Sequence, residues 1–231
     1  MKQLLISLLA PAVLMASGAN VNIGDISISG VTEQTRAPQI SFTGSYPRFA
    51  GMQDTARQKQ LNISMQELER AALERAKAAR ISLPTGDGPE RVVEGVFGYE
   101  VKRNGGGLVS LLFSDYLYSG GANGQTAKKG ITFSSMTGQS YTLADLFRNN
   151  ASYADSINRE IEKQLKERGL EDKLLRNFSG ITDAQTFYVT DSELVIVVQE
   201  TDWFPHYMGA VEFPIPFSQL RSYLKESVIN E

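Results

Sequence analysis

The chain has 231 residues, of which 42% are hydrophobic and 21% charged, with a formal net charge of −3 and no cysteine. This composition is typical of a globular protein that buries a core without disulfides. The small net charge argues against nucleic-acid binding, which favours a basic face. The lack of cysteine excludes disulfides, thiolate metal sites, a cysteine nucleophile and a lipobox.

The first residues, MKQLLISLLAPAVLMASGAN, have the pattern of an export signal. One lysine is followed by an apolar run and then by small side chains. We therefore predict a signal peptide over residues 1–19, cleaved after Ala19, with cleavage after Gly18 as the near alternative. An uncleaved membrane anchor is the other interpretation, which Pro11 and the shortness of the run disfavour. We expect an exported protein, periplasmic or secreted, with no membrane span in the mature chain.

Two strands and a long helix are predicted next. Residues 23–31 and 39–47 alternate apolar and polar side chains, and we expect Pro47 to end the second strand. Residues 52–81 have helical periodicity, and a thin, alanine-rich apolar stripe predicts close packing against a sheet. The stripe consists of Leu61, Met65, Leu68, Ala72, Ala76 and Ala79.

Turn residues at 83–90 predict a joint between two subdomains. The predicted division is a signal peptide at 1–19, a strand-helix subdomain at 20–88 and an α+β subdomain at 89–231. Strands follow near 91–103 and 108–118, and the second has one apolar face and one mixed face that could carry a ligand. The apolar face consists of Val109, Leu111, Phe113 and Leu117, and the mixed face of Leu108, Ser110, Leu112, Ser114, Tyr116 and Tyr118.

Further strands are predicted in the C-terminal half. Residues 131–147 indicate a strand, a turn, a short strand and a helix start, where Thr142 and Asp145 have capping-box spacing. Residues 186–200 indicate a hairpin with TDSE as its turn, and residues 208–216 indicate a last strand.

Two helices complete the prediction. We expect Ser152 and Asp155 to cap a helix that ends at Gly169, and Pro216 to open a second one. Their buried sides are predicted to be Ile157, Ile161 and Leu165 in the first helix, and Phe217, Leu220 and Leu224 in the second. The strands come in neighbouring pairs, so the predicted fold is α+β, with a mainly antiparallel sheet, helices packed against it and two closely associated subdomains.

A glycine-rich loop, YSGGANGQTAKKG, lies between two predicted strands. A phosphate-binding loop would need Gly-Lys-Ser/Thr at a helix start, whereas Lys128 and Lys129 precede a glycine and a strand. No dinucleotide fingerprint is present either. We predict a turn that presents side chains to a ligand, with Tyr118, Gly120, Gly121 and Asn123 as its site residues.

The single histidine, His206, lies beside the single tryptophan, Trp203, and Tyr207. A triad with Asp202 or Asp191 would need a serine nucleophile, but no G-x-S-x-G motif exists. Zinc would have to be bound by one histidine and carboxylates, an uncommon set. We expect no metal and no cofactor, and two interpretations stay open: an aromatic ligand-binding patch, or aromatic rings that close the core.

Carboxylate pairs are the remaining route to an enzyme, because glycosidases use two of them. The candidates by position are Asp115, Glu200 and Asp202.

Several short motifs in a fixed order resemble one family. SYPRFAG followed by a helix containing LN resembles its first half, and YSGGANGQT, ITFSSMTGQSYTLADLF, NFSGITDAQTFYVTDSELVIVVQ and HYMGAVEFPIPFSQLRSYL resemble its second. Together, from about Ile40 to Leu224, they are similar to the extracytoplasmic part of RsiV-type anti-sigma factors. The same region precedes the catalytic domain of some PdaC-type peptidoglycan deacetylases. Where relatives commonly have a histidine after Gly-Gly-Ala, this chain has Asn123.

The resemblance implies an α+β fold with an antiparallel sheet, and a receptor role, since RsiV-type regions bind lysozyme. We do not expect a sigma-binding segment or a deacetylase domain in this chain. The leading hypothesis is a non-enzymatic binding or sensing domain of the bacterial envelope, with a protein such as lysozyme or cell-wall glycan (peptidoglycan) as ligand. The alternatives are an envelope glycan hydrolase or deacetylase that uses carboxylates and His206, and a purely structural envelope protein.

Overall fold

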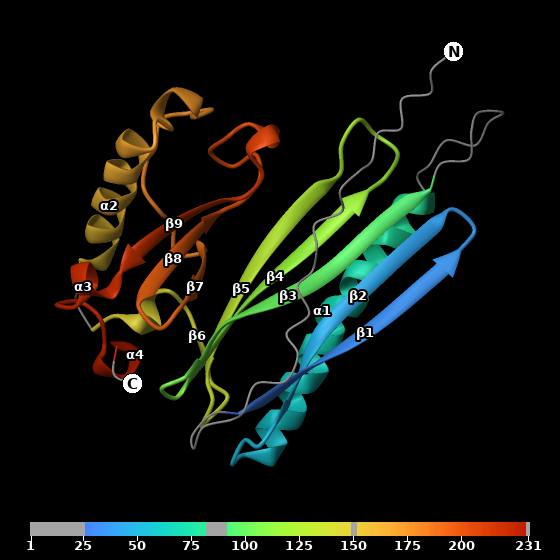
Figure 1. Ribbon diagram of the computed structural model, residues 1–231, viewed down its shortest axis with the longest axis horizontal. Helices are drawn as coiled ribbons and strands as arrows, with labels where there is room; N and C mark the ends of the chain where they lie inside the picture. The colour runs from blue at the N-terminus through green and yellow to red at the C-terminus, as the bar shows by residue number, and fades with distance from the viewer. Residues whose placement is uncertain (1–25, 82–91, 149–151, 230–231) are drawn as a thin grey trace.

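The computed structural model describes residues 26–81, 92–148 and 152–229. Over these residues the strands form two sheets, each with a helix packed against it (Figure 1). The predicted signal peptide and the predicted joint at 83–90 lie outside the described residues.

The first sheet has the strand order β1-β2-β3-β4-β5-β6, and every neighbouring pair is antiparallel except β2 and β3. Its strands are β1 (Ser27–Ala37), β2 (Ile40–Ala50), β3 (Val93–Gly105), β4 (Leu108–Tyr118), β5 (Gln125–Ser134) and β6 (Ser140–Tyr141). The second sheet is antiparallel, in the order β7 (Thr186–Val189), β8 (Glu193–Val198) and β9 (Val211–Pro216).

The helices are α1 (Thr55–Ile81), α2 (Tyr153–Glu167), α3 (Phe217–Leu220) and α4 (Glu226–Ile229), with short 3₁₀ turns η1 (Ala144–Leu146), η2 (Glu171–Lys173) and η3 (His206–Met208). This is the predicted α+β fold with mainly antiparallel strands. β2 and β3 lie on either side of residue 88 and pair in one sheet, and the division of the chain at that residue stays a prediction.

Helix α1 packs on β2 and β3, as its thin apolar stripe predicted. Four members of the stripe are buried, and Leu68 and Ala79 are partly buried. Glycines in the sheet permit the close approach: a β-carbon on Gly95 would lie 2.6 Å from the Phe42 ring and 3.4 Å from the Ala76 side chain. The core between α1 and the first sheet thus forms because the helix presents small side chains to a sheet that also lacks side chains there.

The prediction that Pro47 ends its strand is wrong, since β2 continues to Ala50. β2 pairs with β3 only over Ile40–Gly44, so beyond Gly44 the missing proline N–H breaks no ladder on that side. Asn62 of α1 takes the place of a neighbouring strand: the Phe49 N–H donates to Asn62 Oδ1 (2.7 Å), and Asn62 Nδ2 donates to the Phe49 carbonyl (3.0 Å). The LN of α1 is thereby bonded to the SYPRFAG strand.

The second core lies between α2 and the second sheet. The predicted stripe of α2 is buried, and Gly169, with φ +60°, follows its end. The predicted cap is wrong in one detail, because the Ser152 side chain makes no capping hydrogen bond. The Thr142–Asp145 capping box is confirmed: the Thr142 N–H donates to Asp145 Oδ2 (2.8 Å) and the Asp145 N–H donates to Thr142 Oγ1 (3.3 Å).

The second sheet covers half of the mixed face of β4. Leu108, Ser110 and Leu112 are buried, and Ser110 Oγ accepts a hydrogen bond from the Val189 N–H of β7 (3.0 Å). Beside this contact, a β-carbon on Gly130 of β5 would overlap a backbone carbonyl of β7. The other half of the face, at Ser114, Tyr116 and Tyr118, stays half-buried. The contact between the two sheets therefore leaves only the end of β4 near the glycine loop for a ligand.

Candidate functional site

The two segments predicted to meet a ligand lie at the same end of the two sheets (Figure 1). Tyr118 is the last residue of β4, and Gly120, Gly121 and Asn123 lie in the β4–β5 connection. Trp203, His206 and Tyr207 lie in the connection from β8 to β9. Both predicted segments are thus outside strands except at Tyr118.

The β4–β5 connection is shaped by its glycines. Gly120 has φ +85°, a conformation that costs little only for glycine. A β-carbon on Gly124 would overlap the Tyr116 ring, which therefore packs directly on the backbone of the turn. Burial, and then the charge of Glu94, raise the pKa of Tyr116, so its hydroxyl stays protonated beside this turn. The Tyr116 ring therefore holds the turn, and Tyr116 itself belongs to the half-buried end of β4.

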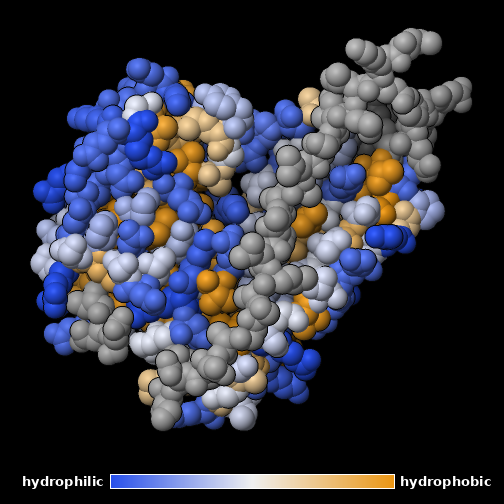
Figure 2. Space-filling view, viewed as in Figure 1, coloured by the Kyte–Doolittle hydropathy of each residue, from blue (hydrophilic) through white to orange (hydrophobic). Residues whose placement is uncertain are grey.

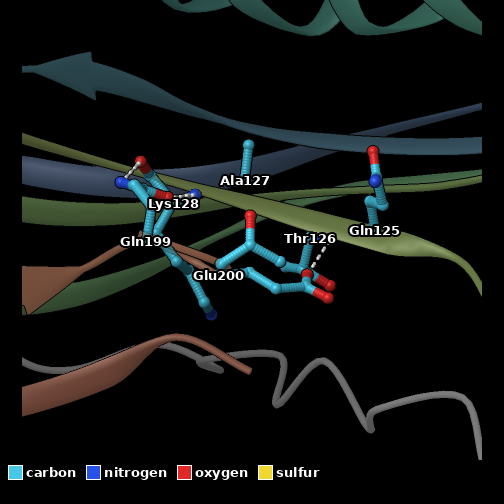
Figure 3. Close-up of a pocket in the computed structure, with 7 residues that line it drawn as sticks. Gln125, Thr126, Ala127, Lys128, Gln199 and Glu200 are labelled. Atoms are coloured by element: carbon cyan, nitrogen blue, oxygen red, sulfur yellow. Dashed lines mark hydrogen bonds between the residues drawn. The ribbon is translucent and has the colours of Figure 1, made fainter. Parts of the chain in front are cut away.

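The two connections are joined through the free edge of β5. Gln199 Nε2 donates to the Lys128 carbonyl (2.7 Å), and Gln199 Oε1 accepts from the Lys128 N–H (2.8 Å). The Thr126 N–H donates to Glu200 Oε2 (2.7 Å) (Figure 3). Gln199 Nε2 also donates to Thr186 Oγ1 of β7 (2.9 Å). We call Gln199 and Glu200 the edge clamp, because their side chains satisfy backbone groups that a neighbouring strand would otherwise bind.

A pocket of about 300 Å³ lies beside the edge clamp. It is lined by residues 125–128 and 199–201. In the space-filling view, hydrophobic residues gather over the upper end of the second sheet, next to a hollow between the two sheets (Figure 2). The pocket is at the small end of the range that holds small ligands, so it suits one anchoring group rather than a whole macromolecule.

Glu200 also contacts His206, between Oε1 and Nδ1. Both carboxylate oxygens of Glu200 are therefore engaged, one by His206 and the other by the Thr126 N–H. The Glu200 side chain is 9% exposed and that of His206 36%. This arrangement attaches the β8–β9 connection to the start of β5.

Two aromatic site residues, Trp203 and Tyr207, differ in environment. Trp203 is half-buried and packs edge-to-face on Phe178, with ring centroids 4.8 Å apart, so it belongs partly to the core. Tyr207, in contrast, is 75% exposed. Leu175, which is 58% exposed, donates its N–H to the Trp203 carbonyl (2.8 Å).

Asp115 and Asp191 lie away from Glu200 and His206. Asp115 pairs with Arg75 of α1, on the helix side of the first sheet. Asp191 lies in the β7–β8 turn, 3.8 Å from Arg103 Nε, and His206 Nδ1 pairs with Glu200 rather than with Asp191 or Asp202. Within the described residues, no group of three or more His, Cys, Asp or Glu side chains could hold a metal ion. At the candidate site, the interactions that join the two connections are thus the Glu200–His206 contact and the hydrogen bonds of the edge clamp.

The sequence did not reveal the edge clamp. Gln199, Thr126 and Lys128 belong to no motif that predicts this contact. The sequence indicates Glu200 only as a candidate catalytic acid. The signal available was the free edge itself, because a long strand beside a very short one leaves backbone groups that something must bind.

Two family descriptions match the chain. "Protein of unknown function (DUF3298)" matches residues 144–218, and "Deacetylase PdaC" matches residues 33–126. The anti-sigma-V factor RsiV of Bacillus subtilis (strain 168) is 32% identical over 113 residues, which cover 45% of this chain and 39% of RsiV. The chain thus matches well under half of that relative's length.

Two solved structures have the same fold. A DUF3298 family member from Bacteroides fragilis NCTC 9343 has a TM-score of 0.73 at 16% identity, over 90% of this chain and 96% of the other. A DUF3298 family protein from Pseudomonas aeruginosa PAO1 has a TM-score of 0.64 at 17% identity, over 88% and 96%. The fold is thus that of DUF3298 domains. Together, the matches support the RsiV-like domain family that the motifs predicted.

Among the described helices, none has the length and apolar character needed to cross a bilayer.

Proposed function

We propose that this chain is an exported binding or sensing domain of the bacterial envelope and not an enzyme. The similarity to an anti-sigma factor suggests a domain of this kind on the extracytoplasmic side. The proposed ligand is a protein such as lysozyme, or the glycan of the cell wall. The proposed site residues are those predicted from sequence: Tyr118, Gly120, Gly121, Asn123, Trp203, His206 and Tyr207.

One observation carries this proposal. Tyr207 is largely exposed on a connection that the edge clamp holds against the start of β5, beside the glycine turn. An exposed tyrosine on a fixed backbone offers a large contact area with little entropy to lose, which is the character of an interface hot spot. Loops on a rigid sheet are also where binding residues concentrate.

An enzyme acting on envelope glycans is the second candidate, because a family named for a deacetylase matches residues 33–126. That stretch contains no histidine, since His206 is the only one in the chain. Catalysis that uses the Glu200 carboxylate itself as acid or base would require it to leave its two present partners, His206 and the Thr126 N–H. These points favour binding over catalysis.

The proposal is tested by interferometry with the chain from residue 20 onwards, using immobilised lysozyme and soluble peptidoglycan fragments as separate baits. We expect saturable binding to one bait, and Tyr207→Ala should weaken it by about 30-fold, which corresponds to a hot spot of about 2 kcal/mol. The matched control is Met136→Ala, another exposed apolar side chain (60%), in the turn between β5 and β6, which should change the affinity less than twofold.

Two results would contradict the proposal. One is binding that Tyr207→Ala leaves unchanged. The other is release of acetate or of reducing ends from peptidoglycan by the purified chain, if Glu200→Gln abolishes that release, because the second candidate predicts this outcome.

A further inference from the structure

Glu69 of α1 is a charged residue buried between the helix and the first sheet. Glu69 is 3% exposed. Its carboxylate faces the backbone of β2 and not a cationic side chain. A β-carbon on Gly44 of β2 would overlap Glu69 Oε1, so the carboxylate occupies the space that this glycine leaves. No hydrogen bond or ion pair joins Glu69 to another side chain or backbone group among the described residues. Buried carboxylates in proteins are normally paired or bind metal ions.

Two further oxygen groups lie next to Glu69. Glu33 of β1 is directly opposite Gly44 in the antiparallel pair, and opposite residues point to the same face with β-carbons about 4.5–5.5 Å apart. Tyr46, two residues beyond Gly44, donates its hydroxyl hydrogen bond to Glu33 Oε1 (3.0 Å). Three side chains from β1, β2 and α1 thus surround the position above Gly44.

Lys77 and Arg48 lie near this group, but no ion pair joins either of them to Glu33 or Glu69 among the described residues. Lys77 lies near enough to favour the ionised form of Glu69, but its ammonium group binds Glu74 Oε1 (2.8 Å). Burial, and then the charge of Glu33, raise the pKa of Glu69. Burial and the hydrogen bond to Glu33 raise the pKa of Tyr46, and the charge of Glu69 raises it further. The charges of Glu33 and Glu69 therefore act on each other, and the Tyr46 hydroxyl is bonded to one of these carboxylates.

We propose that Glu33, Glu69 and the Tyr46 hydroxyl bind a divalent cation, and that this cation is calcium. All the donors are oxygens, and this group includes neither histidine nor thiolate, so a hard cation is favoured over zinc or copper. Calcium tolerates irregular coordination completed by water, whereas magnesium needs near-ideal octahedral geometry. The ion would link the β1–β2 hairpin to α1. With only two carboxylates the site is weak, so we expect a Kd of about 10⁻⁴–10⁻³ M, as in extracellular calcium modules.

The test is a calorimetric calcium titration of the chelator-treated chain, from residue 20 onwards, with magnesium and zinc as parallel arms. Wild-type protein should bind one calcium ion with a Kd in this range and magnesium at least tenfold more weakly. Any zinc binding should be the same in wild type and in the variants of this site. Glu69→Gln and Glu33→Gln should each weaken calcium binding at least tenfold. The matched control is Glu67→Gln, because Glu67 is an exposed glutamate of the same helix, and it should bind as wild type does.

Circular dichroism and thermal melts of each variant, with and without 10 mM calcium, guard against a folding defect. Calcium should raise the melting temperature of wild type and of Glu67→Gln, but not that of the other two variants. The proposal is overturned if wild type shows no saturable binding up to 10 mM calcium. It is equally overturned if a folded Glu69→Gln binds calcium as tightly as wild type does.

Discussion

Replacing Gln199 by leucine tests whether the edge clamp holds the two sheets together at the candidate site. The substitution removes the hydrogen bond that Gln199 accepts from the Lys128 N–H and the two that it donates to the Lys128 carbonyl and Thr186 Oγ1. Each such bond contributes about 0.5–1.5 kcal/mol net. Because Lys128 is only half-buried, water can hydrogen-bond to its freed N–H and carbonyl and offset part of this loss. We therefore expect the free energy of unfolding to fall by about 2 kcal/mol.

Urea denaturation followed by fluorescence measures this loss, and amide hydrogen exchange locates it. The Lys128 N–H should exchange at least tenfold faster in Gln199→Leu, since its acceptor is gone. Gln125→Leu is the control, because Gln125 is exposed on the same strand and lines the same pocket, and it should change stability by less than about 0.5 kcal/mol. A similarly small change in Gln199→Leu, with unaltered exchange at Lys128, would refute the clamp.

Three further predictions concern packing and charge. Gly130→Ala should destabilise the protein by about 1–3 kcal/mol or more, because its β-carbon would overlap a β7 carbonyl, whereas Gly121→Ala, with no foreign atom nearer than 3.9 Å, should be neutral in the same urea assay; equal effects would refute the close sheet contact. Ile161→Ala should cost about 2–5 kcal/mol, because the side chain is fully buried, and a loss below about 0.5 kcal/mol would show that the α2 stripe is not core. The raised pKa of Glu69 means that the folded state binds more protons than the unfolded state, so stability falls as the pH rises through that range. In chelator, Glu69→Gln should therefore be more stable than wild type at pH 7, with a gain that disappears below the usual glutamate range near 4.5; a gain independent of pH would contradict this.

Features with a local cause could be predicted from the sequence. The apolar stripe of α2 and the Thr142–Asp145 box depend on residues three or four apart, and the structure contains both. The glycine turn was predictable for the same reason, because Gly120 needs a backbone conformation that few residues tolerate. Such patterns identify elements and connections, but they do not show which elements meet.

Features that depend on distant partners could not be predicted. Pro47 normally signals a strand end, yet β2 continues because Asn62 of α1 replaces the missing neighbour. The edge clamp joins residues 71 positions apart through an ordinary glutamine. Trp203 was expected on a patch or in the core, and it lies between the two, with its ring on Phe178. In each case the decisive contact is tertiary, so periodicity and residue type contain no record of it.

A ligand bound at the candidate site must contact both the β4–β5 and the β8–β9 connection, and a single measurement can check this. Hydrogen–deuterium exchange of the chain, with and without the bait that binds, reports protection along the whole backbone at once. Our account predicts slower exchange in residues 118–128 and 199–208 on binding, and no change in the β5–β6 turn at 135–139. Protection confined to that turn, or to α1, would contradict the proposed binding site.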